Sequence, residues 1–236
     1  DMVSFTGSTR AGVLVAKAAA DTVKRVTQEL GGKSPNIIFE DANLEKDVTA
    51  GVRRMMNNTG QSCNAPSRML VQSSVYDQAI KIAKTAVEDI AVDQPTKEGE
   101  HLGPLSSRVQ FDKVQGLIKK GIEEGADVVA GGLGKPDGLD IGYFVKPTVF
   151  SGVSNDMTIA QEEIFGPVLT MISFDTEEQA IEIANDTPYG LAAYFSTASE
   201  ERAERVARQL RAGMISVNSA SQNYTAPFGG YKQSGN

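Results

Sequence analysis

Two residues of this chain carry side chains suited to nucleophilic catalysis, and both lie in glycine-containing stretches. Cys63, in the segment GQSCNAPSR (60–68), is the only cysteine among 236 residues. A thiolate nucleophile needs solvent access and nearby positive potential, which backbone N–H groups of a loop provide. Glu29, in QELGGKSP, stands beside two glycines that let another group approach the backbone closely. With a raised pKa or a bound water, its carboxylate is a candidate general base.

Each of these residues also has a purely structural explanation. Free cysteine is among the most frequently buried residue types, and most glutamates are solvated surface residues. Glu162 and Glu163, which open the segment EEIFGPV, are equally ordinary when taken singly. Residue type alone therefore favours the structural explanation, and only the combination of segments can favour catalysis.

Composition excludes several other classes of function. A net charge of −7, with both signs mixed along the chain, argues against binding to a nucleic-acid backbone. One cysteine and one histidine, His101, leave too few ligands for a zinc site, so we predict no metal. The chain has no apolar run near twenty residues and no signal-peptide pattern. These features predict a cytoplasmic protein that is not held in a membrane and does not depend on a disulfide.

The elements that must position these residues alternate between strand and helix along most of the chain. We predict strands at 3–5, 37–39, 69–72, 127–130, 143–150, 168–174, 191–196 and 214–218, and helices at 11–23, 44–58, 74–90, 108–124, 176–185 and 199–213. Such alternation predicts an α/β fold with a largely parallel sheet flanked by helices. Asn43 is a candidate cap for the helix at 44–58, which leaves Cys63 in a loop just beyond the end of that helix.

Five segments occur in a fixed order and together indicate a family. They are FTGST at 5–9, ELGGKSP at 29–35, GQSC at 60–63, EEIFGPV at 162–168 and PFGGYKQSG at 227–235. This series resembles the NAD(P)-dependent aldehyde dehydrogenase superfamily, and the resemblance runs over the whole chain. It implies that residues 1–31 are the last piece of the cofactor-binding domain and that residues 32–236 form the catalytic domain.

The resemblance assigns the chemistry to two residues. Cys63 matches the nucleophile that adds to the aldehyde carbon, and its own backbone N–H would help to hold the resulting oxyanion. Hydride transfer to NAD(P) would leave a thioester, which Glu29 would hydrolyse by activating water. The covalent route divides one difficult oxidation into two easier steps.

The resemblance also assigns a cofactor site, with NAD as the expected cofactor and NADP not excluded. No GxGxxG loop is present, so the ordinary Rossmann fingerprint is missing. The glycine turn after the first strand would hold the pyrophosphate, the segment after Glu29 would lie beside the nicotinamide, and the carboxylate of EEIFGPV would bind the nicotinamide ribose. The implied cofactor-binding residues are Phe5, Gly7, Ser8, Leu30, Gly31, Gln110, Glu163 and Phe165.

The sequence indicates the substrate and the partners less clearly than the catalytic and cofactor-binding residues. Phe228, Gln222 and Tyr224 match the aldehyde entrance, and the polar character of SASQNYTAPF (219–228) favours a small or polar aldehyde. The resemblance implies a small-molecule aldehyde as partner, no nucleic acid or membrane, and a homodimeric or homotetrameric parent protein.

One feature of the match limits the expected activity. The family has a long N-terminal portion, without a counterpart in these 236 residues, that carries most of the cofactor fold and an oxyanion-binding asparagine. We therefore expect this chain alone to bind NAD weakly or not at all and to oxidise aldehydes slowly, since one lost oxyanion donor costs roughly 100- to 1,000-fold in turnover. Two alternatives remain open: a cofactor-independent thiol esterase that uses Cys63 and Glu29, and a non-catalytic binding or structural role.

Overall fold

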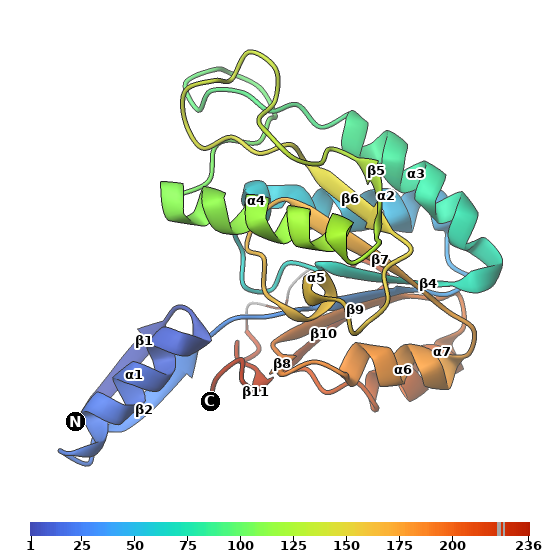
Figure 1. Cartoon of the computed structure of the whole chain (residues 1–236). Helices are drawn as coiled ribbons and strands as arrows, with labels where there is room; N and C mark the ends of the chain where they lie inside the picture. Colours follow the sequence, from blue (N-terminus) through green and yellow to red (C-terminus); the bar gives the residue numbers. More distant parts are fainter. Residues whose placement is uncertain (221–222, 224) are drawn as a thin grey trace.

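The computed structural model describes residues 1–220, 223 and 225–236, and it contains a small lobe and a larger α/β body (Figure 1). The small lobe is a β-α-β unit of β1 (Met2–Thr6), α1 (Thr9–Ala20) and β2 (Arg25–Glu29). Its two strands pair in parallel, with Thr6 beside Glu29 at their carboxyl ends. The Ser8 side chain caps α1 by accepting a hydrogen bond from the Ala11 N–H.

The larger body is built on a sheet of seven strands in the order β10-β9-β3-β4-β7-β6-β5. These strands are β3 (Pro35–Ile38), β4 (Arg68–Gln72), β5 (Asp127–Ala130), β6 (Thr148–Ser151), β7 (Val168–Phe174), β9 (Ala192–Ser196) and β10 (Met214–Val217). Six of them are parallel, and only the edge strand β5 runs antiparallel to its neighbour. The predicted largely parallel α/β sheet is therefore confirmed.

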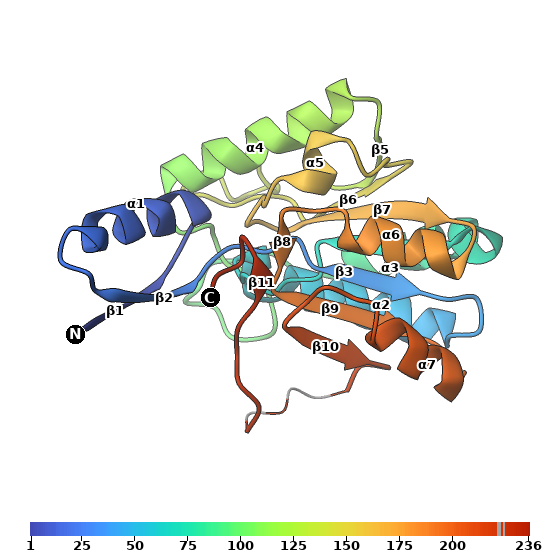
Figure 2. The same cartoon turned by 90° about the horizontal axis from the view of Figure 1, so that it is seen from below.

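Helices cover both faces of this sheet (Figures 1 and 2). Short 3-10 turns, η1 (Asn57–Gly60) and η2 (Ser73–Val75), flank β4. One face carries α2 (Leu44–Met56) and α3 (Tyr76–Glu88), and the other carries α4 (Arg108–Glu123), α5 (Thr158–Gln161), α6 (Glu177–Asn185) and α7 (Glu200–Ala207). Successive residues of one strand serve opposite cores: Ile37 packs with the α4–α7 side and Ile38 with the α2–α3 side. Both are fully buried, which stabilises the fold by about 1.5–3 kcal/mol each.

The start of α2 agrees with the sequence prediction, and its end differs by two residues. Asn43 caps α2, as predicted, by accepting a hydrogen bond from the Lys46 N–H. The helix stops at Met56 rather than at 58, because Asn58, Thr59 and Gly60 all adopt positive φ angles. Cys63 therefore lies in a loop beyond the end of this helix, as predicted.

The C-terminal segment returns to the small lobe, which periodicity did not predict. β11 (Tyr231–Lys232) pairs antiparallel with β8 (Tyr189–Gly190), and Asn236 exchanges two backbone hydrogen bonds with Gln28. The C-terminus consequently lies at the junction of the lobe and the body (Figure 2). Within the described ranges, the helices are too short or too polar to cross a bilayer.

Candidate active site

The predicted catalytic segments meet at one edge of the large sheet. Pro35 in β3 pairs beside Arg68 in β4, and Arg68 pairs beside Thr170 in β7. Because these strands are parallel, the loops that enter them, 29–34, 60–67 and 162–167, emerge side by side at their amino ends. The carboxyl ends of β1 and β2 point at the same place, since the chain passes directly from Glu29 into the loop before β3. The site therefore lies between the two sheets.

Cys63 is half-buried in the loop before β4 and is pressed against the ELGG segment. A Cβ atom on Gly32 would lie 2.2 Å from the Cys63 carbonyl oxygen, so only glycine permits this approach. The Tyr194 hydroxyl donates a hydrogen bond of 3.0 Å to the carbonyl of Asn64, the next residue. The backbone that follows the thiol is thus fixed by contacts with β9 and with the loop before β3.

The turn that leads into the Cys63 loop stores backbone strain. Asn58 and Thr59 hold φ angles of 53° and 57°, in the left-handed region that side chains disfavour. The Thr59 hydroxyl donates to the Gly103 carbonyl at 3.1 Å, which helps to hold this conformation. A Cβ on Gly60 would lie 2.2 Å from the Gly166 oxygen, so this turn packs directly against the EEIFGPV segment.

Glu29 ends β2 with one carboxylate oxygen unsatisfied. Its Oε2 is buried and has no hydrogen-bond partner among the described residues. Burial raises the pKa of this carboxyl group above its usual value. The other oxygen, Oε1, would lie 3.3 Å from a Cβ atom at Gly229, in the PFGG segment. A carboxylate with a raised pKa and a free lone pair has the properties of a general base that is not committed to a structural ion pair.

Glu163 lies on the backbone of the same ELGG segment. Its Oε1 accepts a hydrogen bond of 3.0 Å from the Gly32 N–H, and a Cβ atom on Gly31 would lie 2.7 Å from its Oε2. Burial raises the pKa of this carboxyl group, while the Gly32 N–H and the charges of Lys113 and Lys33 oppose the rise. Glu163 therefore presents a half-buried carboxylate within the electrostatic reach of Cys63.

The thiol is held neutral at rest. Burial raises the pKa of Cys63, and the negative charges of Glu163 and Glu29 raise it further. The backbone N–H groups of Cys63 and Asn64 favour the thiolate and partly offset this effect. Formation of the nucleophile at neutral pH thus needs a base, and Glu29 is the acidic neighbour with an unsatisfied oxygen.

The tail segment PFGGYKQSG closes the site from the C-terminal side. The Ser234 hydroxyl is fully buried, donates to the Gly31 carbonyl at 2.7 Å and accepts from the Gly190 N–H at 2.9 Å. The Leu30 N–H donates to the Ser234 carbonyl at 2.8 Å. All five segments singled out in the sequence contribute to this one junction.

Gln110 has a structural role that the sequence did not reveal. Its side-chain amide donates to the Ile164 and Phe165 carbonyls at 2.9 and 2.8 Å. Phe165 has a φ angle of 57°, so these bonds support a strained turn beside Glu163. A contact between Gln110 and a ribose stays a prediction.

A cavity of about 430 Å³ opens beside the nucleophile loop and includes Phe228 in its lining. Ser62 and Asn64, the residues on either side of Cys63, also line it. Of the predicted entrance residues, Gln222 and Tyr224 lie outside the described residues.

Comparison with known proteins agrees with this geometry. The model of the aldehyde dehydrogenase family matches residues 1–236. The chain belongs to the aldehyde dehydrogenase family. A 3-succinoylsemialdehyde-pyridine dehydrogenase from a Pseudomonas species is 58% identical over 236 residues, which are 100% of this chain and 50% of that protein. The chain therefore spans about half the length of the curated relatives it matches.

Solved aldehyde dehydrogenases share both the fold and much of the sequence. A variant of aldehyde dehydrogenase C from Pseudomonas syringae, in complex with NAD+ and octanal, matches with a TM-score of 0.98 and 50% identity, covering 100% of this chain and 49% of that one. An aldehyde dehydrogenase from Mycobacterium tuberculosis in complex with NAD+ matches with a TM-score of 0.97 and 46% identity, covering 100% and 48%.

The residues at the start of α1 fit the phosphate part of the dinucleotide that these aldehyde dehydrogenases bind. Gly7 and Ser8 are exposed at the turn, and a Cβ on Gly7 would overlap the Phe5 ring at 2.6 Å. The first turn of α1 contains no acidic residue, so its free N–H groups and helix dipole favour an anion. The carboxylate of Glu163 supplies acceptors suited to ribose hydroxyl groups.

Two buried cations near the site were missed by the sequence analysis. Arg68 is fully buried and donates to the carbonyls of Lys33, Ile183 and Ala184 and to Asn155 Oδ1, at 2.8–3.1 Å. It thereby ties the entry to β3 to the end of α6. The sequence feature that could have indicated its burial is the position of Arg68 directly before the apolar run MLV, which forms a buried strand.

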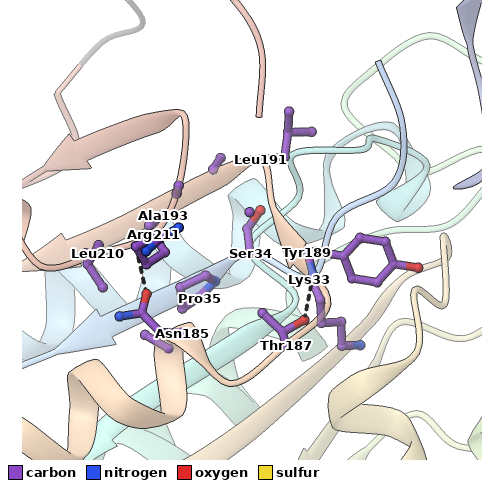
Figure 3. Close-up of a pocket in the computed structure, with 14 residues that line it drawn as sticks. Lys33, Ser34, Pro35, Asn185, Thr187, Tyr189, Leu191, Ala193, Leu210 and Arg211 are labelled. Carbon is purple, nitrogen blue, oxygen red and sulfur yellow. Dashed lines mark hydrogen bonds between the residues drawn. The ribbon is translucent and has the colours of Figure 1, made fainter. Parts of the chain in front are cut away.

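Lys33, the second cation, is 1% exposed, and its Nζ has no hydrogen-bond partner among the described residues. Figure 3 shows its side chain beside Thr187 and below the ring of Tyr189, at a cavity of about 10 Å³, which is the size of one water molecule. Burial, and then the charge of Arg68, lower the pKa of Lys33 to about 7.

Proposed function

We propose that the protein containing this chain oxidises an aldehyde to a carboxylic acid and transfers hydride to NAD, with Cys63 as nucleophile and Glu29 as general base. The observation that carries the proposal is that the loops carrying the half-buried Cys63 thiol and Glu29 enter neighbouring parallel strands, and that a buried oxygen of Glu29 has no partner among the described residues. Membership of the aldehyde dehydrogenase family and the NAD+ complexes of its relatives support it.

In the first step, Glu29 takes the thiol proton and the sulfur adds to the aldehyde carbon. The raised pKa of Glu29 suits it to accept that proton, directly or through one water molecule. The addition turns the aldehyde oxygen into an oxyanion. The N–H groups of Cys63 and Asn64 favour negative charge at the sulfur, and they are the donors that we expect to hold this oxygen.

The cofactor supplies the hydride acceptor for oxidation of the adduct when it is bound. Gly7 and Ser8 would hold its pyrophosphate, Leu30 and Gly31 would border the nicotinamide, and Glu163 would bind the ribose hydroxyls. The acyl group would then be bound to Cys63 as a thioester. Glu29 would remove a proton from water, and the hydroxide would displace the sulfur and release the carboxylic acid.

The substrate class follows from the cavity beside Cys63 and from the relatives. Its lining mixes apolar side chains with Arg54, Asn57 and Tyr194, which favours an aldehyde with polar groups. The 58%-identical relative is named for an aldehyde that carries a pyridine ring, whereas another relative was solved with octanal. We also infer, from the family resemblance and from the composition, a cytoplasmic homodimer or homotetramer that does not bind nucleic acid.

Aldehyde-dependent NADH formation tests the proposal. The assay uses a protein that contains the chain together with the additional sequence found in its relatives, and a panel of aliphatic, aromatic and hydroxylated aldehydes. We expect turnover that Cys63→Ala abolishes and Glu29→Gln lowers by roughly 100- to 10,000-fold, as for loss of a general base. Full activity in Cys63→Ala would refute the mechanism.

The 236 residues alone give a second test. We expect weak NAD binding and slow aldehyde oxidation from this chain, and tight binding in a calorimetric titration would contradict that expectation. Hydrolysis of an activated ester without NAD that disappears in Cys63→Ala would instead favour the thiol esterase alternative for the chain by itself. Absence of both activities from the longer protein, which contains the additional sequence found in the relatives, would favour the non-catalytic alternative.

A further inference from the structure

The charge of the cavity beside Cys63 is unusual for this protein. The chain has 30 acidic and 23 basic residues, yet among the described residues that line this cavity there is no Asp or Glu. The one charged side chain in the described lining is Arg54, in the last turn of α2. A single positive charge in a cavity of about 430 Å³ makes that wall attractive to anions.

The side chain of Arg54 is held in place by a contact with Tyr194. Its guanidinium carbon lies 4.9 Å from the centroid of the Tyr194 ring, a cation–π distance. The Tyr194 hydroxyl is itself fixed by its 3.0 Å hydrogen bond to the Asn64 carbonyl, one residue from the nucleophile. None of the ion pairs within the described part of the chain includes Arg54, so the guanidinium donors that are not directed at Tyr194 are available for a ligand.

We propose that the cavity selects aldehydes that carry a carboxylate at their far end, and that Arg54 is the residue that recognises this carboxylate. The inference rests on the proposed function, because the aldehyde carbon must reach Cys63. The apolar part of the lining, which includes Met214, Ile215 and Phe228, supplies surface for the methylene groups between the two ends. Arginine binds a carboxylate in a bidentate, charge-assisted geometry, which neutral aldehydes of the same shape cannot reproduce.

Protection of Cys63 from alkylation tests this without any cofactor. The thiol adds reversibly to an aldehyde, forming one C–S bond while the proton goes to the oxygen, and the adduct cannot react with iodoacetamide. Because Cys63 is the only cysteine, alkylation reports one site. The probes are 4-oxobutanoate and its neutral shape match, 4-methylpentanal. We expect the anionic aldehyde to protect the thiol at roughly tenfold lower concentration.

Two variants separate recognition from general charge effects. Arg54→Gln should remove the tenfold preference, whereas Arg53→Gln, the same charge change one residue earlier and outside this cavity, should preserve it. Equal protection by both probes in the unmodified chain, or an unchanged preference in Arg54→Gln, would overturn the inference while leaving the proposed function in place. Failure of both aldehydes to protect the thiol would instead overturn the proposed nucleophile, and the inference with it.

Discussion

Lys33 provides a direct test of how burial acts on a charge beside this site. The side chain is 1% exposed, its Nζ has no partner among the described residues, and its pKa is lowered to about 7. Replacement by methionine keeps an unbranched side chain, one atom shorter than that of lysine, and removes the ionisable group. We therefore predict that Lys33→Met stabilises the folded chain at pH 6 and that this gain disappears at high pH.

Proton linkage explains why Lys33→Met should stabilise the chain at low pH and not at high pH. The pKa of Lys33 in the folded state is about 7, whereas the ordinary value is 10.5. Between these values the unfolded chain binds a proton that the folded chain does not, so the stability of the unmodified chain rises with pH across this window. The penalty is complete below about pH 7 and is absent above about pH 10.5. At about 1.4 kcal/mol per pH unit, the largest possible gain from Lys33→Met is about 5 kcal/mol.

Urea unfolding followed by circular dichroism measures the effect, because the chain has no tryptophan for fluorescence. The informative quantity is the difference in unfolding free energy between Lys33→Met and the unmodified chain from pH 6 to pH 10. Lys119→Met is the control, since that lysine is 67% exposed and its replacement should change stability by no more than about 0.5 kcal/mol at any pH. A difference for Lys33→Met that stays constant with pH would refute the reasoning, whatever its sign.

Three further predictions concern the site and its supports. The rate of Cys63 alkylation should rise continuously up to pH 9. Because the charge of Glu163 raises the pKa of the thiol, Glu163→Gln should shift this rate profile to lower pH. A profile that does not shift in Glu163→Gln would contradict the effect of Glu163 on the thiol. Gly32→Ala should lower stability by more than about 2 kcal/mol in urea titrations, since its Cβ would lie 2.2 Å from the Cys63 oxygen, whereas Gly116→Ala has open space and should be neutral or stabilising. Arg68→Met should cost about 3–5 kcal/mol by leaving buried carbonyls without donors, and a loss below about 1 kcal/mol would contradict that role.

Much of the fold was predictable because its signals are local. Alternation of strand and helix patterns predicted the parallel α/β architecture, and Asn43 marked the start of α2. The short elements were missed: α5 has four residues and β8 and β11 have two each, too few for a period to show. The overrun at the end of α2 had a different cause, since the positive φ angles of Asn58 and Thr59 depend on packing against segments far away in sequence.

The sequence by itself determined which reactive groups the chain possesses and the order of the segments that carry them. It placed Cys63 in a loop and Glu29 beside two glycines, and through resemblance it connected both to one chemistry. Only the tertiary structure decided that the loops carrying these groups enter neighbouring strands, that Glu29 Oε2 and Lys33 Nζ are buried without partners among the described residues, and that Arg54 is the only charge in the described lining of its cavity. The reason is physical: secondary structure follows from the period of neighbouring side chains, whereas burial and charge environment depend on strand order, which brings residues more than a hundred positions apart into contact.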